Sequence, residues 1–252
     1  MLKKIQTDKL TTEVYESRAA MGRAAGQAAA DAIRAVLKEK DFANVIFAAA
    51  PSQNEMLDSL FASDVDFSRV RAFHMDEYVG LCIDDAQSFA RYLYDHAFSR
   101  AKFASVNYID TMKGIEESCL AYEKILKEFP PDVVCMGIGE NGHIAFNDPP
   151  VADFHDPYLV KKVELDMICR MQQVHDGCFP TLDDVPKYAL TLTVPALMSA
   201  QTLICTVPAK SKAQAVKAML EGACGEHCPA TALRFHDNAK MFLDADSASE
   251  VL

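Results

Sequence analysis

The spacing of apolar residues switches between two periods along the chain, one typical of strands and one typical of helices. This alternation predicts strands and helices in turn. Residues 12–39 start at Thr12, a suitable N-cap, and then carry apolar residues at helical spacing among many alanines, which predicts a long amphipathic helix. Residues 55–62 predict a second helix. Strands are predicted at four short apolar runs, each followed by polar or glycine-rich residues: 44–50, 70–75, 133–138 and 202–207. We therefore expect a single α/β domain over residues 1–252, built on a doubly wound, mostly parallel sheet with helices on both faces.

The segments that follow the predicted strands are the natural places for a ligand. In Rossmann-like sheets of this kind, ligands bind beyond the carboxyl ends of the strands. Four segments meet this condition: 51–54, 76–78, 139–148 and 208–212. We expect them to meet at one edge of the sheet and to form the functional site.

Charge and cysteine content narrow the choice of ligand. The 252 residues carry 25 Lys and Arg against 36 Asp and Glu, a net charge of −11, and no basic stripe that would bind nucleic acid is visible. An anionic small molecule would therefore need a local cationic pocket. No stretch is long and apolar enough to suggest membrane insertion or a secretory leader, so we expect no membrane partner.

The eight cysteines show no disulfide-like spacing, so we expect reduced thiols and a cytoplasmic protein. Cys224, His227 and Cys228 invite a zinc interpretation, but no second ligand pair has suitable spacing. We expect no metal.

One candidate segment places a glycine-rich turn directly after a predicted buried strand. The turn begins at Gly137 and Gly139 and is followed by His143 and Asp148. Glycines let the backbone approach a ligand closely. A glycine-rich turn alone is weak evidence, and a lone histidine is more often structural.

A second candidate segment ends a predicted strand with adjacent carboxylates, Asp76 and Glu77. Such acids can simply cap the next helix through its dipole. Catalysis becomes the better interpretation because both segments are expected at the same sheet edge. Two carboxylates and an imidazole there would supply distinct acid and base groups.

Both segments resemble the two signature segments of glucosamine-6-phosphate deaminases. These are Phe-His-Met-Asp-Glu-Tyr-Val-Gly-Leu at 73–81 and Gly-Ile-Gly-Glu-Asn-Gly-His-Ile-Ala-Phe-Asn-Asp-Pro at 137–149. Residues 185–191 and 210–213 also resemble that family in order and approximate spacing. The resemblance spans nearly the whole chain. The related 6-phosphogluconolactonases continue differently after the Gly-His pair, so the resemblance favours the deaminases.

The resemblance implies a role for each matching residue. Asp76 would be the base that moves a proton between C2 and C1 of the opened sugar, and His143 would assist ring opening. Asp148 would orient His143 or relay its proton, with Asn141 in a positioning role. The amine would leave as ammonia, giving a ketose phosphate without any cofactor or metal. The remaining candidates are expected to bind the sugar phosphate: Ser52, Gln53, Glu77, Gly139, Arg170 and Lys212.

Three departures from the family pattern bear on the substrate. The Thr-Gly-rich phosphate turn of the family is replaced by residues 50–55, where Pro51 lacks an N–H and Glu55 adds negative charge. Asp148 stands where the family more often has Glu. Residues 169–179 stand where the deaminases carry an active-site arginine, and the polar candidates there are Arg170, Gln173 and His175.

Several alternatives stay open at this point. Galactosamine-6-phosphate is as compatible with the motifs as glucosamine-6-phosphate. A 6-phosphogluconolactonase-like hydrolase and a non-catalytic sugar-phosphate sensor are two further interpretations. Relatives occur as monomers and as hexamers, so the sequence leaves monomer and homo-oligomer open.

Overall fold

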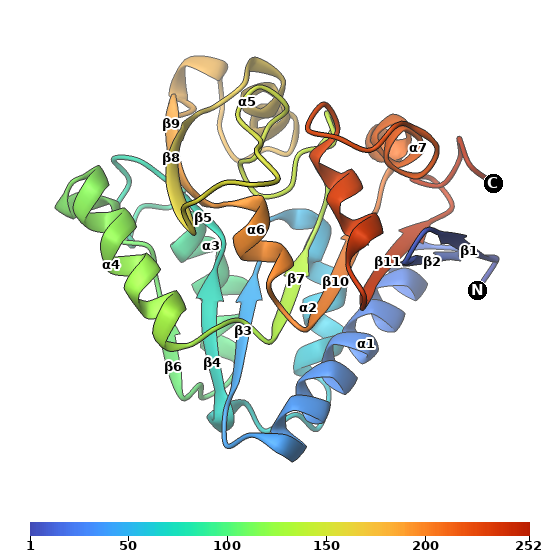
Figure 1. Cartoon of the computed structure of the whole chain (residues 1–252), viewed down its shortest axis with the longest axis horizontal. Helices are drawn as coiled ribbons and strands as arrows, with labels where there is room; N and C mark the ends of the chain where they lie inside the picture. The colour runs from blue at the N-terminus through green and yellow to red at the C-terminus, as the bar shows by residue number, and fades with distance from the viewer.

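An eight-stranded sheet forms the centre of the computed structural model, which describes residues 1–252 (Figure 1). The strand order is β1-β2-β11-β10-β7-β3-β4-β6, and every neighbouring pair is parallel except the β1–β2 hairpin. A second, antiparallel sheet has the order β5-β9-β8. The strands of the large sheet are β1 (Lys3–Thr7), β2 (Leu10–Tyr15), β3 (Ala43–Phe47), β4 (Val70–His74), β6 (Ser105–Asn107), β7 (Val133–Met136), β10 (Thr202–Val207) and β11 (Ala239–Asp244). Those of the small sheet are β5 (Asp76–Tyr78), β8 (Val160–Glu164) and β9 (Tyr188–Leu192).

Helices cover both faces of the large sheet, as the sequence pattern predicted. All residues of β3 and β7 are buried, which explains why these strands read as continuous apolar runs. Side chains from α1, α2 and α3 join one buried cluster, and those from α4, α6 and α7 join the other. The helices are α1 (Arg18–Glu39), α2 (Asn54–Phe61), α3 (Phe89–His96), α4 (Ile115–Glu128), α5 (Met167–His175), α6 (Val194–Met198) and α7 (Ala213–Glu221). None of these helices has the length and apolar character needed to cross a membrane.

The predicted first helix was wrong at its beginning. Residues 10–15 form β2, whose side chains alternate between buried and partly buried positions, which is the period of a strand. The helix begins at Arg18 after the N-cap Ser17, whose hydroxyl accepts a hydrogen bond from the N–H of Ala20. Thr12 is therefore a buried strand residue and not a cap.

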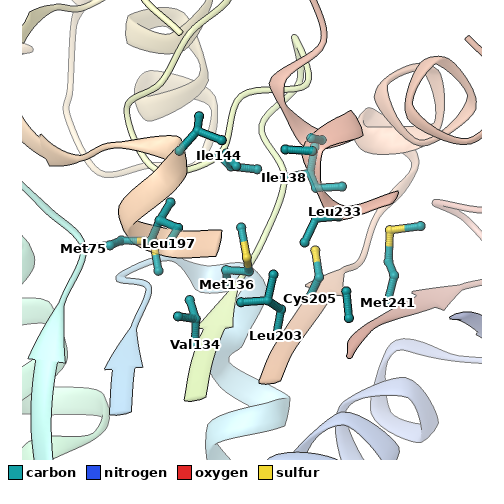
Figure 2. Packing of buried hydrophobic residues seen from close by; sticks show 14 of the residues in the cluster. Met75, Val134, Met136, Ile138, Ile144, Leu197, Leu203, Cys205, Leu233 and Met241 are labelled. Carbon is teal, nitrogen blue, oxygen red and sulfur yellow. The ribbon is translucent and has the colours of Figure 1, made fainter. Parts of the chain in front are cut away.

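The polar segments that follow the strands are anchored in the core by apolar neighbours. Met75 precedes Asp76, while Ile138 and Ile144 flank the glycine-rich turn, and all three belong to one buried cluster. Figure 2 shows them beside Met136 and Leu197, above the carboxyl ends of the parallel strands. These two polar segments therefore begin from fixed points in the core.

Candidate active site

The four segments predicted to meet at the carboxyl edge of the sheet do line one pocket. Ser52, Asp76, His143 and Lys212 contribute to it, one from each segment. Helix α5 supplies a further part of the wall through Gln172. In Figure 1 this region lies between the upper ends of the parallel strands and α5.

Asp76 begins β5, where its backbone pairs with Thr191 of β9. Its side chain lines the pocket but is only 6% exposed. Burial, and secondarily the neighbouring charge of Glu77, raises the pKa of Asp76 well above its ordinary value. A carboxylate with a raised pKa is a stronger proton acceptor, which suits a general base.

Glu77, the adjacent acid, has a different task. Its carboxylate accepts hydrogen bonds from the backbone N–H groups of Tyr78 (2.9 Å), Phe89 (3.0 Å) and Ala90 (2.8 Å). Burial raises the pKa of Glu77 to about 7, although these N–H groups oppose the rise. Glu77 does not line the pocket. The predicted substrate contact from Glu77 therefore does not fit the structure, and helix capping, the alternative interpretation of the adjacent acids, describes this residue.

His143 is held by two partners on one ring nitrogen. Its Nδ1 lies 2.8 Å from Oδ1 of Asn141 and 2.9 Å from Oδ1 of Asp148. The side-chain amide of Asn141 also donates to Oδ1 of Asp148 at 3.0 Å. A ring nitrogen between two acceptors carries the proton, which leaves Nε2 to exchange protons with a ligand.

Asp148 lies behind His143 and is fully buried. Burial alone would raise its pKa, but the hydrogen bond and charge of His143, helped by Asn141 and the N–H of Asp166, lower the pKa below the ordinary value. Asp76 and Asp148 thus have pKa values shifted in opposite directions. Such a separation is what distinct proton-transfer and charge-stabilising roles require.

Gly139 makes room for the imidazole of His143. A Cβ placed on Gly139 would lie 2.1–2.3 Å from three atoms of that ring. Gly142, by contrast, has a φ of +83°, in the left-handed region that favours glycine. The glycine-rich turn therefore shapes the seat of the histidine, and Gly139 also lines the pocket, as the predicted ligand contact requires.

A second part of the pocket wall, which we call the Lys212 end, is built around Lys212. This lysine ends a 3₁₀ turn over Lys210–Lys212, and its Nζ is buried without any hydrogen-bond partner. Burial lowers the pKa of Lys212, while Asp176 and Glu140 act in the opposite direction. Ser52 and Gln53 line the pocket from a second 3₁₀ turn, Pro51–Gln53. An unpartnered buried cation is a natural seat for an anionic ligand.

Comparison with known proteins shows the family to which the chain belongs. A family model described as glucosamine-6-phosphate isomerases/6-phosphogluconolactonase matches residues 16–242. The chain belongs to this family. It is 33% identical over 193 residues to a protein named glucosamine-6-phosphate deaminase from Ligilactobacillus salivarius (strain UCC118), covering 76% of this chain and 80% of that one. It is 34% identical over 218 residues to one of the same name from Bacillus thuringiensis (strain Al Hakam), covering 86% and 81%.

Solved structures of the glucosamine-6-phosphate isomerase/6-phosphogluconolactonase family share the fold. A structure described as a monomeric glucosamine-6-phosphate deaminase superposes with a TM-score of 0.87 at 28% identity, covering 95% of this chain and 99% of that one. A 6-phosphogluconolactonase from Thermotoga maritima superposes with a TM-score of 0.75 at 22% identity, covering 93% and 99%. The second likeness shows the fold alone.

The pocket of this family member also contains residues that sequence reasoning missed. Arg18 lines it from the first turn of α1, and its Nε donates to Oε1 of Glu55 at 2.7 Å. Glu55, counted from the sequence as an added negative charge, is therefore paired with a cation. The misplaced start of the first helix hid Arg18. Gln172 and Asp176 line the pocket from α5 and the residue that follows it. Gln173, already a polar candidate, lines it too.

Arg170 does not lie in the pocket. Its guanidinium donates to the carbonyls of Leu182 (2.7 Å) and Val185 (2.9 Å), so it fixes the loop between α5 and β9. The predicted phosphate contact from Arg170 therefore does not fit the structure. His175 is exposed and does not line the pocket either.

One cluster could hold a metal. Ligand atoms of His143, Asp148 and Cys169 lie within 4.8 Å of one another and are buried. The same imidazole and carboxylate already satisfy each other and Asn141, so the geometry serves a hydrogen-bond network without an ion. The absence of a metal stays a prediction.

Proposed function

We propose that this protein is an amino-sugar-6-phosphate deaminase/isomerase that converts its substrate and water into a ketose 6-phosphate and ammonia. The observation that carries the proposal is the meeting of Asp76, His143 and the unpartnered Nζ of Lys212 in one pocket. They come from three different segments, and each supplies a group that the reaction needs.

The reaction begins with ring opening. His143, through Nε2, exchanges a proton with the ring oxygen, while Asp148 holds Nδ1 and stabilises the imidazolium. Asp76 then takes the proton from C2 and returns it to C1, while the C1 oxygen gains a proton and the amine loses one, which leaves an imine at C2. Water adds to that carbon, and ammonia leaves. The raised pKa of Asp76 supports its role, because it must both accept and release the proton.

Lys212 supplies charge for the phosphate, with Ser52 as a hydroxyl partner. Desolvation of a lone ammonium is costly, so a ligand anion that reaches Nζ removes that cost.

The eight free cysteines support a cytoplasmic enzyme. The likeness to a structure described as monomeric supports a monomer over a homo-oligomer.

The direct test is product formation from two epimers. Purified protein is incubated with glucosamine-6-phosphate or galactosamine-6-phosphate, and ammonia and ketose phosphate are measured in the same sample. Equal amounts of both products from at least one epimer are expected. Release from neither epimer, together with hydrolysis of 6-phosphogluconolactone, would replace the proposal with a lactonase. Tight binding without any turnover would replace it with a sensor.

A further inference from the structure

The Lys212 end of the pocket carries charges of both signs. Lys212 and Arg18 supply two cations. Against them stand Glu55, which pairs with Arg18, and the carboxylates of Asp176 and Glu140, which both act on Lys212. Three carboxylates therefore stand against two cations before any ligand arrives, with Glu55 and Glu140 outside the pocket lining. A doubly charged phosphate would add to an existing excess of negative charge.

Asp176 is the carboxylate of this group that belongs to the pocket wall. The side-chain amide of Gln172 donates to its Oδ2 at 3.2 Å, and both residues line the pocket. Asp176 is exposed to solvent in the open pocket. A ligand that covers it replaces that water and must then tolerate the carboxylate at close range.

Two buried atoms near the Lys212 end have no hydrogen-bond partner, and they need opposite kinds of partner. Nζ of Lys212 is a donor that needs an acceptor, while Oε1 of Gln53 is an acceptor that needs a donor. The orientation of the Gln53 amide is fixed, because its Nε2 donates to the carbonyl of Thr206 at 3.2 Å. A ligand that reaches both atoms must therefore bring acceptor oxygens and at least one proton.

Three ligand groups can be compared against these demands. A phosphate dianion offers acceptors but no proton, and it meets Asp176 with like charge. A hydroxyl offers both, but it leaves the buried ammonium of Lys212 without a counter-charge. A phosphate carrying one proton offers acceptor oxygens, an O–H donor and a single negative charge. The third group satisfies all the partners at once.

We propose that Asp176 is a specificity-determining residue that makes this pocket select the singly protonated, monoanionic form of the substrate's phosphate group. This inference rests on the function proposed above, because it concerns the phosphate of that substrate. The monoanion places its unprotonated oxygens toward Lys212 and relieves the repulsion that Asp176 exerts on the dianion.

Other titratable groups surround the site and must be separated from the effect. Cys169 of α5 and Glu140 of the glycine-rich turn act on Lys212, Glu55 of α2 pairs with Arg18, and Asp76 and His143 line the same pocket. A probe that keeps one negative charge at every pH reports their contribution. A sulfate monoester is such a probe, since it has the same shape and no proton to lose.

The experiment measures the dissociation constants of glucitol 6-phosphate and glucitol 6-sulfate by calorimetry with the wild-type protein between pH 5.5 and pH 8. These open-chain ligands cannot be isomerised, so binding is measured without turnover. The affinity for the phosphate relative to the sulfate is expected to fall about 50-fold between pH 6 and pH 8, following loss of the monoanion with a second pKa near 6. A ratio that rises with pH would show selection of the dianion and overturn the proposal.

Two variants sharpen the test. Asp176→Asn removes the carboxylate and keeps its shape, so the fall in the affinity ratio should shrink to about fivefold or less. Asp183→Asn changes another exposed aspartate on the following loop, outside the pocket, and should keep the full wild-type fall. A fall that persists in Asp176→Asn would overturn the role of Asp176.

Glucitol binding as tightly as its phosphate would show that the Lys212 end takes a hydroxyl and would overturn the proposal. Failure of the proposed reaction appears separately, as absent ammonia release.

Discussion

The two ends of the pocket are constructed differently. At the end with Asp76 and His143, both side chains are buried, and His143 takes its partners Asn141 and Asp148 from its own short stretch of chain. At the end with Lys212, the groups come from α1, two 3₁₀ turns and α5, and charges of both signs mix. The residues proposed to move protons therefore lie in two continuous segments, whereas those proposed to bind the phosphate come from segments that are far apart in the sequence.

Removing the proposed base should give the largest loss of activity. A small loss would contradict the distinction between the two ends of the pocket. Asp76→Asn is expected to lower kcat by about 10²- to 10⁴-fold, because proton transfer by a positioned side chain contributes that much. KM should change only a few-fold, since the base acts in the transition state. Steady-state ammonia release measures both quantities. The adjacent Glu77→Gln offers the matched contrast, because it should lower thermal stability through the α3 cap and leave kcat within a few-fold. Equal kcat losses in the two variants would contradict the division of roles.

Displacing the histidine tests whether the glycine-rich turn is its seat. In Gly139→Ala the added methyl meets the imidazole of His143, which must move. A displacement near 1 Å can cost on the order of 10²-fold in rate, so kcat should fall by about that factor. The control is the same change in a His143→Ala background, where little further loss is expected. A full additional loss there would show that Gly139 acts by another route.

The same contrast explains which features could be predicted from the sequence. The parallel sheet, the meeting of four segments at one pocket and the places of Asp76, His143 and Lys212 in that pocket were predicted correctly, because period, turn residues and motif are local properties of the chain. Arg18 was missed because the alternation of β2 was taken for the start of a helix.

The errors at Glu77 and Arg170 have a different physical origin. Both are charged residues beside the site in sequence, but each side chain turns away to satisfy backbone groups: three N–H groups for Glu77 and two carbonyls for Arg170. Most of these groups lie in the first turn of α3 and in or just after the 3₁₀ turn Leu182–Asp184. Sequence spacing cannot show which backbone groups lack partners until the tertiary structure is known.

A change at the Lys212 end should alter binding rather than chemistry. Lys212→Ala removes a charged hydrogen-bond donor, so KM should rise by about 10- to 100-fold, the equivalent of the ~1.5–3 kcal/mol of such a bond. The value of kcat should stay within a few-fold, because the contact is made equally in the ground and transition states. Lys210→Ala, an exposed lysine of the same turn, should leave both parameters unchanged. A kcat loss as large as the KM increase would place Lys212 in the chemistry and erase the distinction between the two ends.

The smallest expected effect is on protein stability and concerns the buried residue His74. His74, the last residue of β4, is fully buried, and its Nε2 accepts a hydrogen bond from the N–H of Ile109 at 2.6 Å. Burial lowers the pKa of His74 to about 3, so the folded protein keeps it neutral while the unfolded chain binds a proton near pH 6.5. Its contribution to stability is complete above pH 6.5 and is lost as the pH falls from 6.5 toward 3.

The free energy of unfolding should therefore decrease by about 1.4 kcal/mol through His74 between pH 7.5 and pH 5.5, one pH unit below the unfolded value. Glu77 acts in the opposite direction, because its raised pKa of about 7 favours the folded state as the pH falls toward 4.5. Urea unfolding of wild type and His74→Gln at both pH values isolates the histidine, since Glu77 contributes equally to each. The variant should lose less stability on acidification than the wild type. Identical losses would mean that His74 takes up a proton within the folded core.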